Sequence, residues 1–184
     1  MVSKHFFTLS VDSDIELALV EECFAPLYSA LVSTQQDHLS QWLAWPPYCQ
    51  SEQDFRLFIQ RSLIDYAEGK SLTCAILFQG EIVGNCSFND IDHELKRVKV
   101  GYWLSREHTN KGIMTRVVKK LIDLAFTKYQ MDKVELSAAV ENWASRAVAE
   151  RSGLVLEGVI SNSERIGERI LDHAIYAIHN PNRT

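Results

Sequence analysis

The chain has 184 residues with 24 acidic and 19 basic side chains, which gives a formal net charge of −5. This acidic balance argues against nucleic acid as the main ligand, because domains that bind duplexes usually carry a basic surface. The hydrophobic fraction of 46% is ordinary for a globular protein, and the length suits a single domain.

No uncharged stretch reaches the roughly 20 apolar residues that span a bilayer. Acidic residues within the first thirty positions do not fit the basic and then apolar layout of a signal peptide. We therefore expect a cytoplasmic protein with no membrane partner. The four cysteines, Cys23, Cys49, Cys74 and Cys86, are widely spaced and predict neither a zinc site nor a redox motif, so no metal is expected.

The N-terminal third favours helices at residues 15–31, 38–43 and 51–68. Ser51 followed by Asp54 is typical of a helix start, and apolar residues recur at helical spacing behind it. A break is expected between the second and third helices, because WPP at 45–47 disfavours helical backbone.

The rest of the chain changes period several times. Alternation of apolar residues predicts strands at 72–78, 82–88, 96–104 and 133–140, and 154–160 and 169–178 close the chain as two more. Helical periodicity predicts a helix over 113–125, and a second helix from Asn142 to Arg151, which Gly153 would end. Helices followed by a meander and then by alternating strands and helices indicate an α+β fold.

One junction has the composition of an anion site. A strand runs into SREHTNKGIM, where Gly112 precedes an amphipathic helix and Arg106, Lys111 and Arg116 add positive charge. Unpaired N–H groups and the helix dipole favour phosphate at such a helix start. The signal is weak by itself, and neither the dinucleotide nor the nucleoside triphosphate glycine pattern is present.

The possible anion site lies within a longer pattern made of two runs, VGYWLSREHTNKGIMTRVVKKLIDLAF and VELSAAVENWASRAVAERSGLVLEG. They resemble the Gcn5-related N-acetyltransferase (GNAT) superfamily and, within it, the RimL-type acetyltransferases of ribosomal-protein N-termini. LSQWLAWPPY and the following SEQDF resemble the same branch. The resemblance implies one GNAT-like domain over 1–184, with a mixed, mostly antiparallel sheet flanked by helices. Residues of about 12–69 would shape the acceptor site, and about 71–178 would bind acetyl-CoA.

In the superfamily, an Arg or Gln begins the phosphate loop, a glycine follows three residues later, and a Gly or Ala stands two residues beyond it. Gly112 matches the central glycine, whereas Thr109 and Met114 depart from the pattern. The resemblance implies that a splayed strand and this loop hold acetyl-CoA through Tyr102, Trp103, Leu104, Thr109, Asn110, Lys111, Gly112, Ile113, Met114, Asn142 and Ser145. Asn142 is equally explained as a helix cap, and Arg116, Lys119 and Lys120 either reach the 3′-phosphate or form a solvated helix face.

Acetyl transfer to an α-amine, whose pKa is about 8, needs a proton acceptor. The resemblance gives Glu164 as the base and Ser145 as the acid, with Tyr176 as an alternative acid. Without the resemblance, Glu164 fits a solvated loop and Tyr176 fits the core. A backbone N–H near Trp103 or Leu104 would stabilise the oxyanion.

The RimL branch implies that the acceptor is the N-terminal α-amine of a ribosomal protein. A small amine as acceptor and a non-catalytic acyl-CoA-binding protein stay open as alternatives. Trp42, Trp45 and Tyr48 either line the acceptor cleft or pack the N-terminal helices. Pairing of the last strands or of the N-terminal helices would be compatible with a homodimer.

Overall fold

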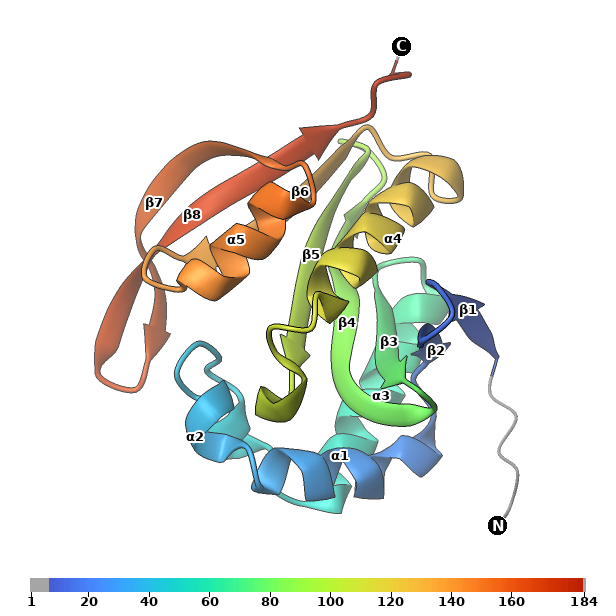
Figure 1. Ribbon diagram of the computed structural model, residues 1–184, viewed down its shortest axis with the longest axis vertical. Coiled ribbons are helices and arrows are strands. Elements are labelled where there is room, and N and C mark those ends of the chain that lie inside the picture. The colour runs from blue at the N-terminus through green and yellow to red at the C-terminus, as the bar shows by residue number, and fades with distance from the viewer. Residues whose placement is uncertain (1–6, 184) are drawn as a thin grey trace.

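The computed structural model describes residues 7–183, in which eight strands form a single mixed sheet (Figure 1). The strand order is β1-β2-β3-β4-β5-β6-β8-β7. Only β5 and β6 pair in parallel, and all other neighbours are antiparallel. The predicted α+β class with a mixed, mostly antiparallel sheet is confirmed.

The strands are β1 (Thr8–Ser10), β2 (Ile15–Leu19), β3 (Leu72–Phe78), β4 (Glu81–Asp92), β5 (Arg97–Leu104), β6 (Lys133–Ala139), β7 (Val155–Ile166) and β8 (Arg169–His179). The α-helices are α1 (Ala25–Ser33), α2 (Gln36–Leu39), α3 (Glu52–Ala67), α4 (Ile113–Thr127) and α5 (Trp143–Arg151), and the 3₁₀ turns are η1 (Glu22–Phe24), η2 (Pro46–Tyr48) and η3 (Arg106–His108). Within the described residues no helix is long and apolar enough to cross a membrane.

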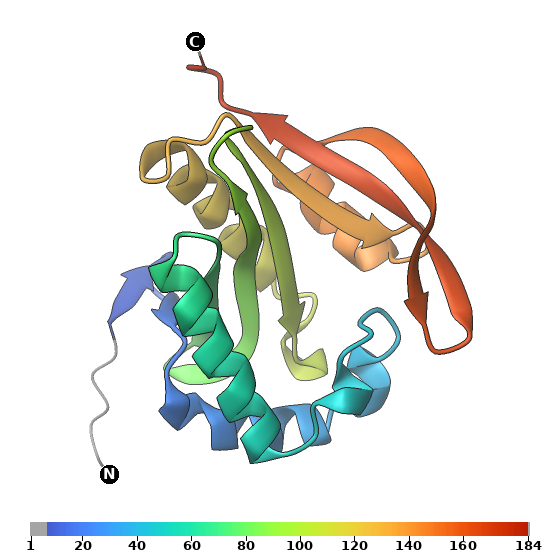
Figure 2. The ribbon, with the colours of Figure 1, turned by 180° about the vertical axis from the view of Figure 1, so that it is seen from behind.

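Helices cover both faces of the sheet. In Figure 1, α4 and α5 lie in front of it, and Figure 2 shows α3 on the opposite face, with α1 and α2 crossing near the end of β5. The apolar stripe of α4 packs through Val117, Val118 and Leu121 into the larger core cluster. Tyr28 and Phe55 belong to a second cluster beneath α1 and α3.

The predicted helix over 15–31 is wrong in its first part. Residues Ile15–Leu19 form β2, which pairs with β3, and helical structure begins only at η1. Ile15 and Leu17 join one core cluster while Ala18 joins the other, so this strand is buried on both faces. Such a strand gives an almost continuous apolar run rather than a clean alternation, and a short apolar run does not distinguish strand from helix.

The predicted helix over 38–43 is also displaced, because α2 ends at Leu39 and residues 40–45 are not helical. Most other elements lie close to their predicted positions. Helix α3 begins with the expected capping box, in which Ser51 accepts from the Asp54 N–H and the Asp54 side chain accepts from the Ser51 N–H. Strand β7 is longer than expected, because it continues to Ile166 beyond a bulge at residues 161–163. The polar residues of this bulge interrupt the alternation that marks a strand.

The one parallel pair opens the sheet. Strands β5 and β6 pair only from Arg97 opposite Lys133 to Val100 opposite Leu136. Beyond that point β5 follows β4 alone, and β6 follows β8. Figure 2 shows the two strands diverging, so the predicted splay of β5 from its neighbour is confirmed.

Candidate active site

A cleft of about 1820 Å³ lies where β5 and β6 separate. One part of its lining comes from α4 and α5, including Gly112 and Ser145. Another part comes from the opposite side of the sheet, including Trp45, Glu164 and His173. The gap between the strands therefore gives two molecules access to a common point from the two faces of the sheet.

The first turn of α4 forms an open anion cradle. Gly112 is the N-cap residue with φ of +71° and no capping side chain, and Asn110 also has a positive φ, +61°. A Cβ built on Gly112 would meet nothing within 4 Å. The first N–H groups of a helix have no intrahelical partner. The Lys111 ammonium lies over the Phe78 ring, 5.9 Å from its centroid, and Lys111 is not among the residues that line the cleft. These features fit a pyrophosphate.

Two residues from the N-terminal helices fix the loop that leads into this cradle. Gln35 is buried, accepts from the Arg106 N–H at 3.1 Å and donates to both carboxylate oxygens of Glu107 at 3.1 Å. His38 Nε2 lies 3.3 Å from the Leu104 carbonyl oxygen. The N–H of Glu107 itself and then Gln35 lower the pKa of the Glu107 carboxyl. Sequence reasoning missed both contacts, because their partners lie more than 60 positions away along the chain.

Ser145 and Tyr102 form a hydroxyl pair across the splay. The Tyr102 hydroxyl lies 2.8 Å from Ser145 Oγ, and burial raises the pKa of Tyr102 to about 12. The Ser145 N–H donates to Asn142 Oδ1 at 3.1 Å, so Asn142 is the predicted helix cap. Asn142 and Ser145 also line the cleft.

Glu164 reaches the cleft from β7, on a paired strand rather than a solvated loop. Its Oε2 lies 3.1 Å from His173 Nε2 on β8. The other ring nitrogen, Nδ1, lies 2.8 Å from Ser137 Oγ on β6. Neither His173 nor Ser137 was assigned a role from the sequence. Their pairing follows from strand register, which the sequence alone does not provide.

Tyr176 is not brought to the site. Its side chain belongs to the buried core, and its hydroxyl accepts from Arg146 Nε and donates to Glu150 Oε1, each at 3.0 Å. It is not among the residues that line the cleft. A tyrosine held in this way is not placed to protonate a leaving group, and the alternative reading of Tyr176 as a core residue fits its position.

The remaining predicted coenzyme contacts lie along the cleft wall. Leu104, Ile113 and Met114 are buried, so their backbone atoms are better placed for a ligand than their side chains. The Trp103 ring packs against Tyr28, with centroids 5.7 Å apart. Thr109 donates its hydroxyl to the Arg106 carbonyl oxygen at 2.8 Å.

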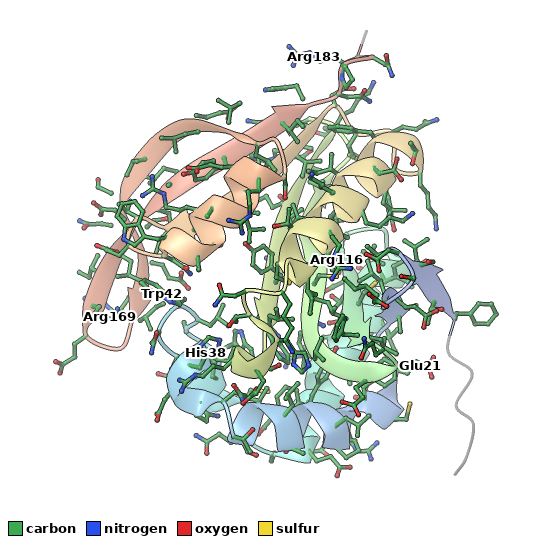
Figure 3. The ribbon with its side chains drawn as sticks, in the orientation of Figure 1. Glu21, His38, Trp42, Arg116, Arg169 and Arg183 are labelled. Carbon is green, nitrogen blue, oxygen red and sulfur yellow. The ribbon has the colours of Figure 1, made fainter. Side chains whose placement is uncertain are left out.

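The aromatic residues after α2 line the cleft, and two of them, Trp42 and Trp45, also pack against buried clusters. Trp42 contacts a small buried cluster that includes Leu171, and the Arg169 guanidinium lies 5.7 Å from its ring centroid. Figure 3 shows Trp42 next to the β7–β8 hairpin that carries Arg169. The Trp45 ring packs at a tilt against the Trp103 ring, with centroids 6.0 Å apart. Tyr48 is 84% exposed at the rim of the cleft.

Arg116, on α4, pairs with a carboxylate of the same chain. Its guanidinium donates to Asp12 Oδ2 at 2.8 Å, and Figure 3 labels it beside the N-terminal strands. The backbone N–H of Asp14 also donates to the Asp12 carboxylate. This pairing favours a structural role for Arg116 over a contact with the 3′-phosphate.

Comparison with known proteins agrees with this geometry. Residues 18–155 match the family model described as an acetyltransferase (GNAT) domain. The ribosomal-protein-serine acetyltransferase of Escherichia coli (strain K12) is 31% identical over 92% of this chain and 95% of its own length. The putative ribosomal N-acetyltransferase YdaF of Bacillus subtilis (strain 168) is 32% identical over 83% of this chain and 84% of its own.

Solved structures extend the likeness to three dimensions. RimL, a ribosomal L7/L12 α-N-protein acetyltransferase in complex with coenzyme A, superposes with a TM-score of 0.90 at 28% identity, covering 94% of this chain and 97% of that one. The microcin C7 self-immunity acetyltransferase MccE, in complex with acetyl-CoA and AMP, superposes with a TM-score of 0.88 at 30% identity. The match covers 92% of this chain and 94% of that one. The chain thus belongs to the GNAT family of N-acetyltransferases and resembles its RimL branch.

Proposed function

We propose that this chain transfers the acetyl group of acetyl-CoA to the N-terminal α-amine of a ribosomal protein. The observation that carries the proposal is the cleft at the β5–β6 splay, lined by Gly112 and Ser145 from one face and by Glu164 from the other. Donor and acceptor enter from opposite faces and meet at the gap. The names of the bacterial relatives support the choice of acceptor.

On the donor side, the Gly112 cradle binds the pyrophosphate of acetyl-CoA. Backbone groups of residues 101–104 face the gap instead of β6 and hydrogen-bond the pantetheine arm. Thr109 and Met114 depart from the family's loop pattern, but the Met114 side chain is buried and leaves the cradle open. Coenzyme A and acetyl-CoA in two of the solved relatives support this assignment.

The chemical step is an attack by the neutral amine on the thioester carbonyl. A C–N bond forms and the C–S bond breaks, and Glu164 takes the proton that the amine nitrogen loses. The backbone N–H of Trp103 or Leu104 stabilises the oxyanion. Ser145 donates a proton to the departing thiolate as the Tyr102 hydroxyl, 2.8 Å away, passes its own proton to Ser145. Solvent then returns a proton to Tyr102 and takes one from Glu164.

The acceptor side suits the end of a polypeptide. The cleft continues past Trp45 and Tyr48 at its rim, which leaves room for residues that follow the reacting amine. A ribosomal acceptor places the enzyme in the cytoplasm, where thiols such as the buried Cys74 and Cys86 remain reduced.

A small amine is the second candidate acceptor. The observation that favours it is the likeness to MccE, whose solved structure holds acetyl-CoA and AMP rather than a peptide. An amine carried on a nucleotide-like molecule would enter by the same face as a peptide. The two candidates differ in whether chain length beyond the first residue improves the rate.

The test is coenzyme A release, followed with a thiol reagent, from the purified protein with acetyl-CoA and a panel of amines. The panel holds N-terminal peptides, the same peptides with a blocked α-amine, and small amines. We expect release with free peptides and none with blocked ones. Release with small amines alone would move the assignment to the second candidate, and binding of acetyl-CoA without release would contradict catalysis.

A further inference from the structure

Three polar side chains form a chain across three strands at the acceptor end of the cleft. Ser137 on β6 contacts Nδ1 of His173 on β8, and Nε2 of His173 faces Glu164 on β7, at 2.8 Å and 3.1 Å. All three line the cleft. Accepting the proposed function, we propose that His173 is a positioning residue that holds the Glu164 carboxylate in place as the base.

The β7 bulge explains how the carboxylate comes to face the imidazole. Ile160 pairs with His173 and Glu164 pairs with Leu171, so residues 161–163 lie opposite the single residue Asp172. The Asp172 carboxylate accepts from the backbone N–H of Asn162 at 2.8 Å and fixes the bulge. A bulge re-aims the side chains that follow it, and here it turns Glu164 toward the cleft beside His173.

The environment of the imidazole favours this role over simple packing. The His173 side chain is only 14% exposed, and its Nε2 is buried with no well-angled hydrogen bond within the described residues. When the Ser137 hydroxyl donates to Nδ1, the ring proton lies on Nε2, and the Glu164 carboxylate oxygen, 3.1 Å from Nε2, is the acceptor within reach. A buried N–H without an acceptor is costly, so a small turn of either side chain that aligns this contact stabilises the orientation of both.

The charged groups around the imidazole come from two strands. Glu164 faces it from β7, and Glu135 lies two residues before Ser137 on the same face of β6. Glu135 is held by Arg97 at 3.4 Å and by Lys133 at 2.8 Å. Among residues 7–183, Glu164 has no such cation, and its side chain is 35% exposed. His173, at 3.1 Å, is the ionisable side chain that the structure shows in contact with the proposed base.

The strands also provide a matched control pair. His179 lies further along β8, and its Nε2 is 3.3 Å from Glu157 Oε1 on β7. Neither residue lines the cleft. His179→Phe removes an equivalent histidine–carboxylate contact from the same two strands without touching the site.

The kinetic test compares His173→Phe, His173→Gln and His179→Phe in acetyl transfer to an N-terminal peptide. Positioned acid–base groups typically contribute 10²–10⁴-fold, so losing the orientation of the base should lower kcat by about 10- to 100-fold. The KM for acetyl-CoA should stay unchanged, because the cradle lies on the other face of the sheet. Glutamine keeps an N–H donor and should recover most of the rate, while His179→Phe should behave as wild type.

NMR of the histidine ring nitrogens supplies a readout that does not depend on activity. The His173 signals are assigned as those missing in His173→Gln, and their chemical shifts are then compared in wild type and in Glu164→Gln at one pH. The hydrogen bond that a ring nitrogen makes decides where the ring proton lies, so we expect the His173 Nε2 shift to change in Glu164→Gln while the shifts of His179 stay constant.

The outcomes separate the two proposals. A wild-type protein that acetylates no peptide overturns the proposed function, and the ring shifts then report the contact alone. An active wild type whose kcat is unchanged in His173→Phe overturns the positioning role. His173 ring shifts that are the same in Glu164→Gln also overturn it, even if His173→Phe does not fold.

Discussion

The leaving thiolate is the part of the reaction for which the structure gives the most specific local chemistry. Tyr102 on β5 and Ser145 on α5 approach to 2.8 Å across the gap between the strands. Burial raises the pKa of Tyr102 to about 12, so its hydroxyl stays protonated at neutral pH and can donate to Ser145. The pair forms a short proton path that ends at the cleft.

Ser145→Ala is expected to lower kcat by about 10- to 100-fold, because the thiolate loses its proton donor. Tyr102→Phe should cost less, since Ser145 keeps its own hydroxyl. Initial rates of coenzyme A release with saturating substrates measure both effects. Equal rates in Ser145→Ala and wild type would remove Ser145 from the mechanism.

Gly112→Leu is expected to weaken binding of coenzyme A by about tenfold or more, because the new side chain occupies the cradle where phosphate contacts form. Gly167→Leu is the matched control. Gly167 also has a positive φ, +59°, and open space around its Cβ, but it lies in the turn between β7 and β8. Calorimetric titration separates blocked binding from backbone strain, and equal affinity in both variants would contradict the cradle.

At the scale of elements, the N-terminal helices act on the donor site from a distance. The turn between α1 and α2 provides Gln35, and α2 provides His38, and both bind the segment that joins β5 to α4. The end of β5 and the start of α4 are thereby held at a fixed separation. The N-terminal part thus contacts the loop that leads into the proposed acetyl-CoA cradle.

Gln35→Ala should lower the free energy of unfolding by about 1 kcal/mol, because the Arg106 N–H loses its part-buried acceptor. It should also weaken coenzyme A binding by loosening the cradle. Gln36→Ala is the control, since Gln36 donates to the Pro46 carbonyl oxygen instead. Urea unfolding and calorimetry measure the two effects, and identical behaviour of the two variants would contradict the coupling.

Local patterns predicted the elements whose periodicity is undisturbed. Helix α4 has a one-sided apolar stripe and α3 has a complete capping box, and both were located from the sequence. The start of segment 15–31 was predicted as helix but forms strand β2. This strand is buried on both faces, and its pairing with β3 decides its structure. The extension of β7 was missed because its bulge depends on Asp172, on the neighbouring strand.

The site residues that were predicted also differ from those that were missed in how local their contacts are. Gly112 and Asn142 lie at helix starts, which short sequence patterns identify, and Ser145 and Glu164 came from the family resemblance. Gln35, Ser137 and His173 were not predicted, because their contacts join different strands or segments that lie far apart along the chain. Only the register of the strands and the packing of α1 against the sheet bring these partners together.

For the whole molecule, the sheet leaves β7 as an exposed edge. Val155, Leu156, Val159 and Ile160 are each 45–70% exposed on this strand. Unpaired edge strands with apolar side chains favour pairing with another chain. We propose that two copies associate through β7.

Val159→Lys should shift such a dimer toward monomer, because an edge lysine opposes strand pairing. Leu95→Lys is the control, as Leu95 is similarly exposed, at 67%, in the turn between β4 and β5. Sedimentation velocity at several concentrations measures the change. A wild-type protein that stays monomeric at high concentration would contradict the dimer.

Alkaline pH should destabilise the fold. Burial raises the pKa of Tyr102 and of Tyr129 to about 12, above the ordinary value of about 10. Below pH 10 these tyrosines are protonated in both states, and between pH 10 and 12 they ionise only when the chain unfolds. The melting temperature should therefore fall over this window, and Tyr102→Phe should make the fall shallower. An equally steep fall in that variant would contradict the assignment.

Locating the transferred acetyl group is the decisive measurement for the proposed reaction. A peptide carrying both a free α-amine and an internal lysine is incubated with the protein and acetyl-CoA, and fragmentation mass spectrometry assigns the modified nitrogen. We expect acetyl on the α-nitrogen, loss of most of this product in Glu164→Gln, and an unmodified lysine. Acetylation of the lysine alone, or no acetylation of any peptide, would contradict the proposed reaction.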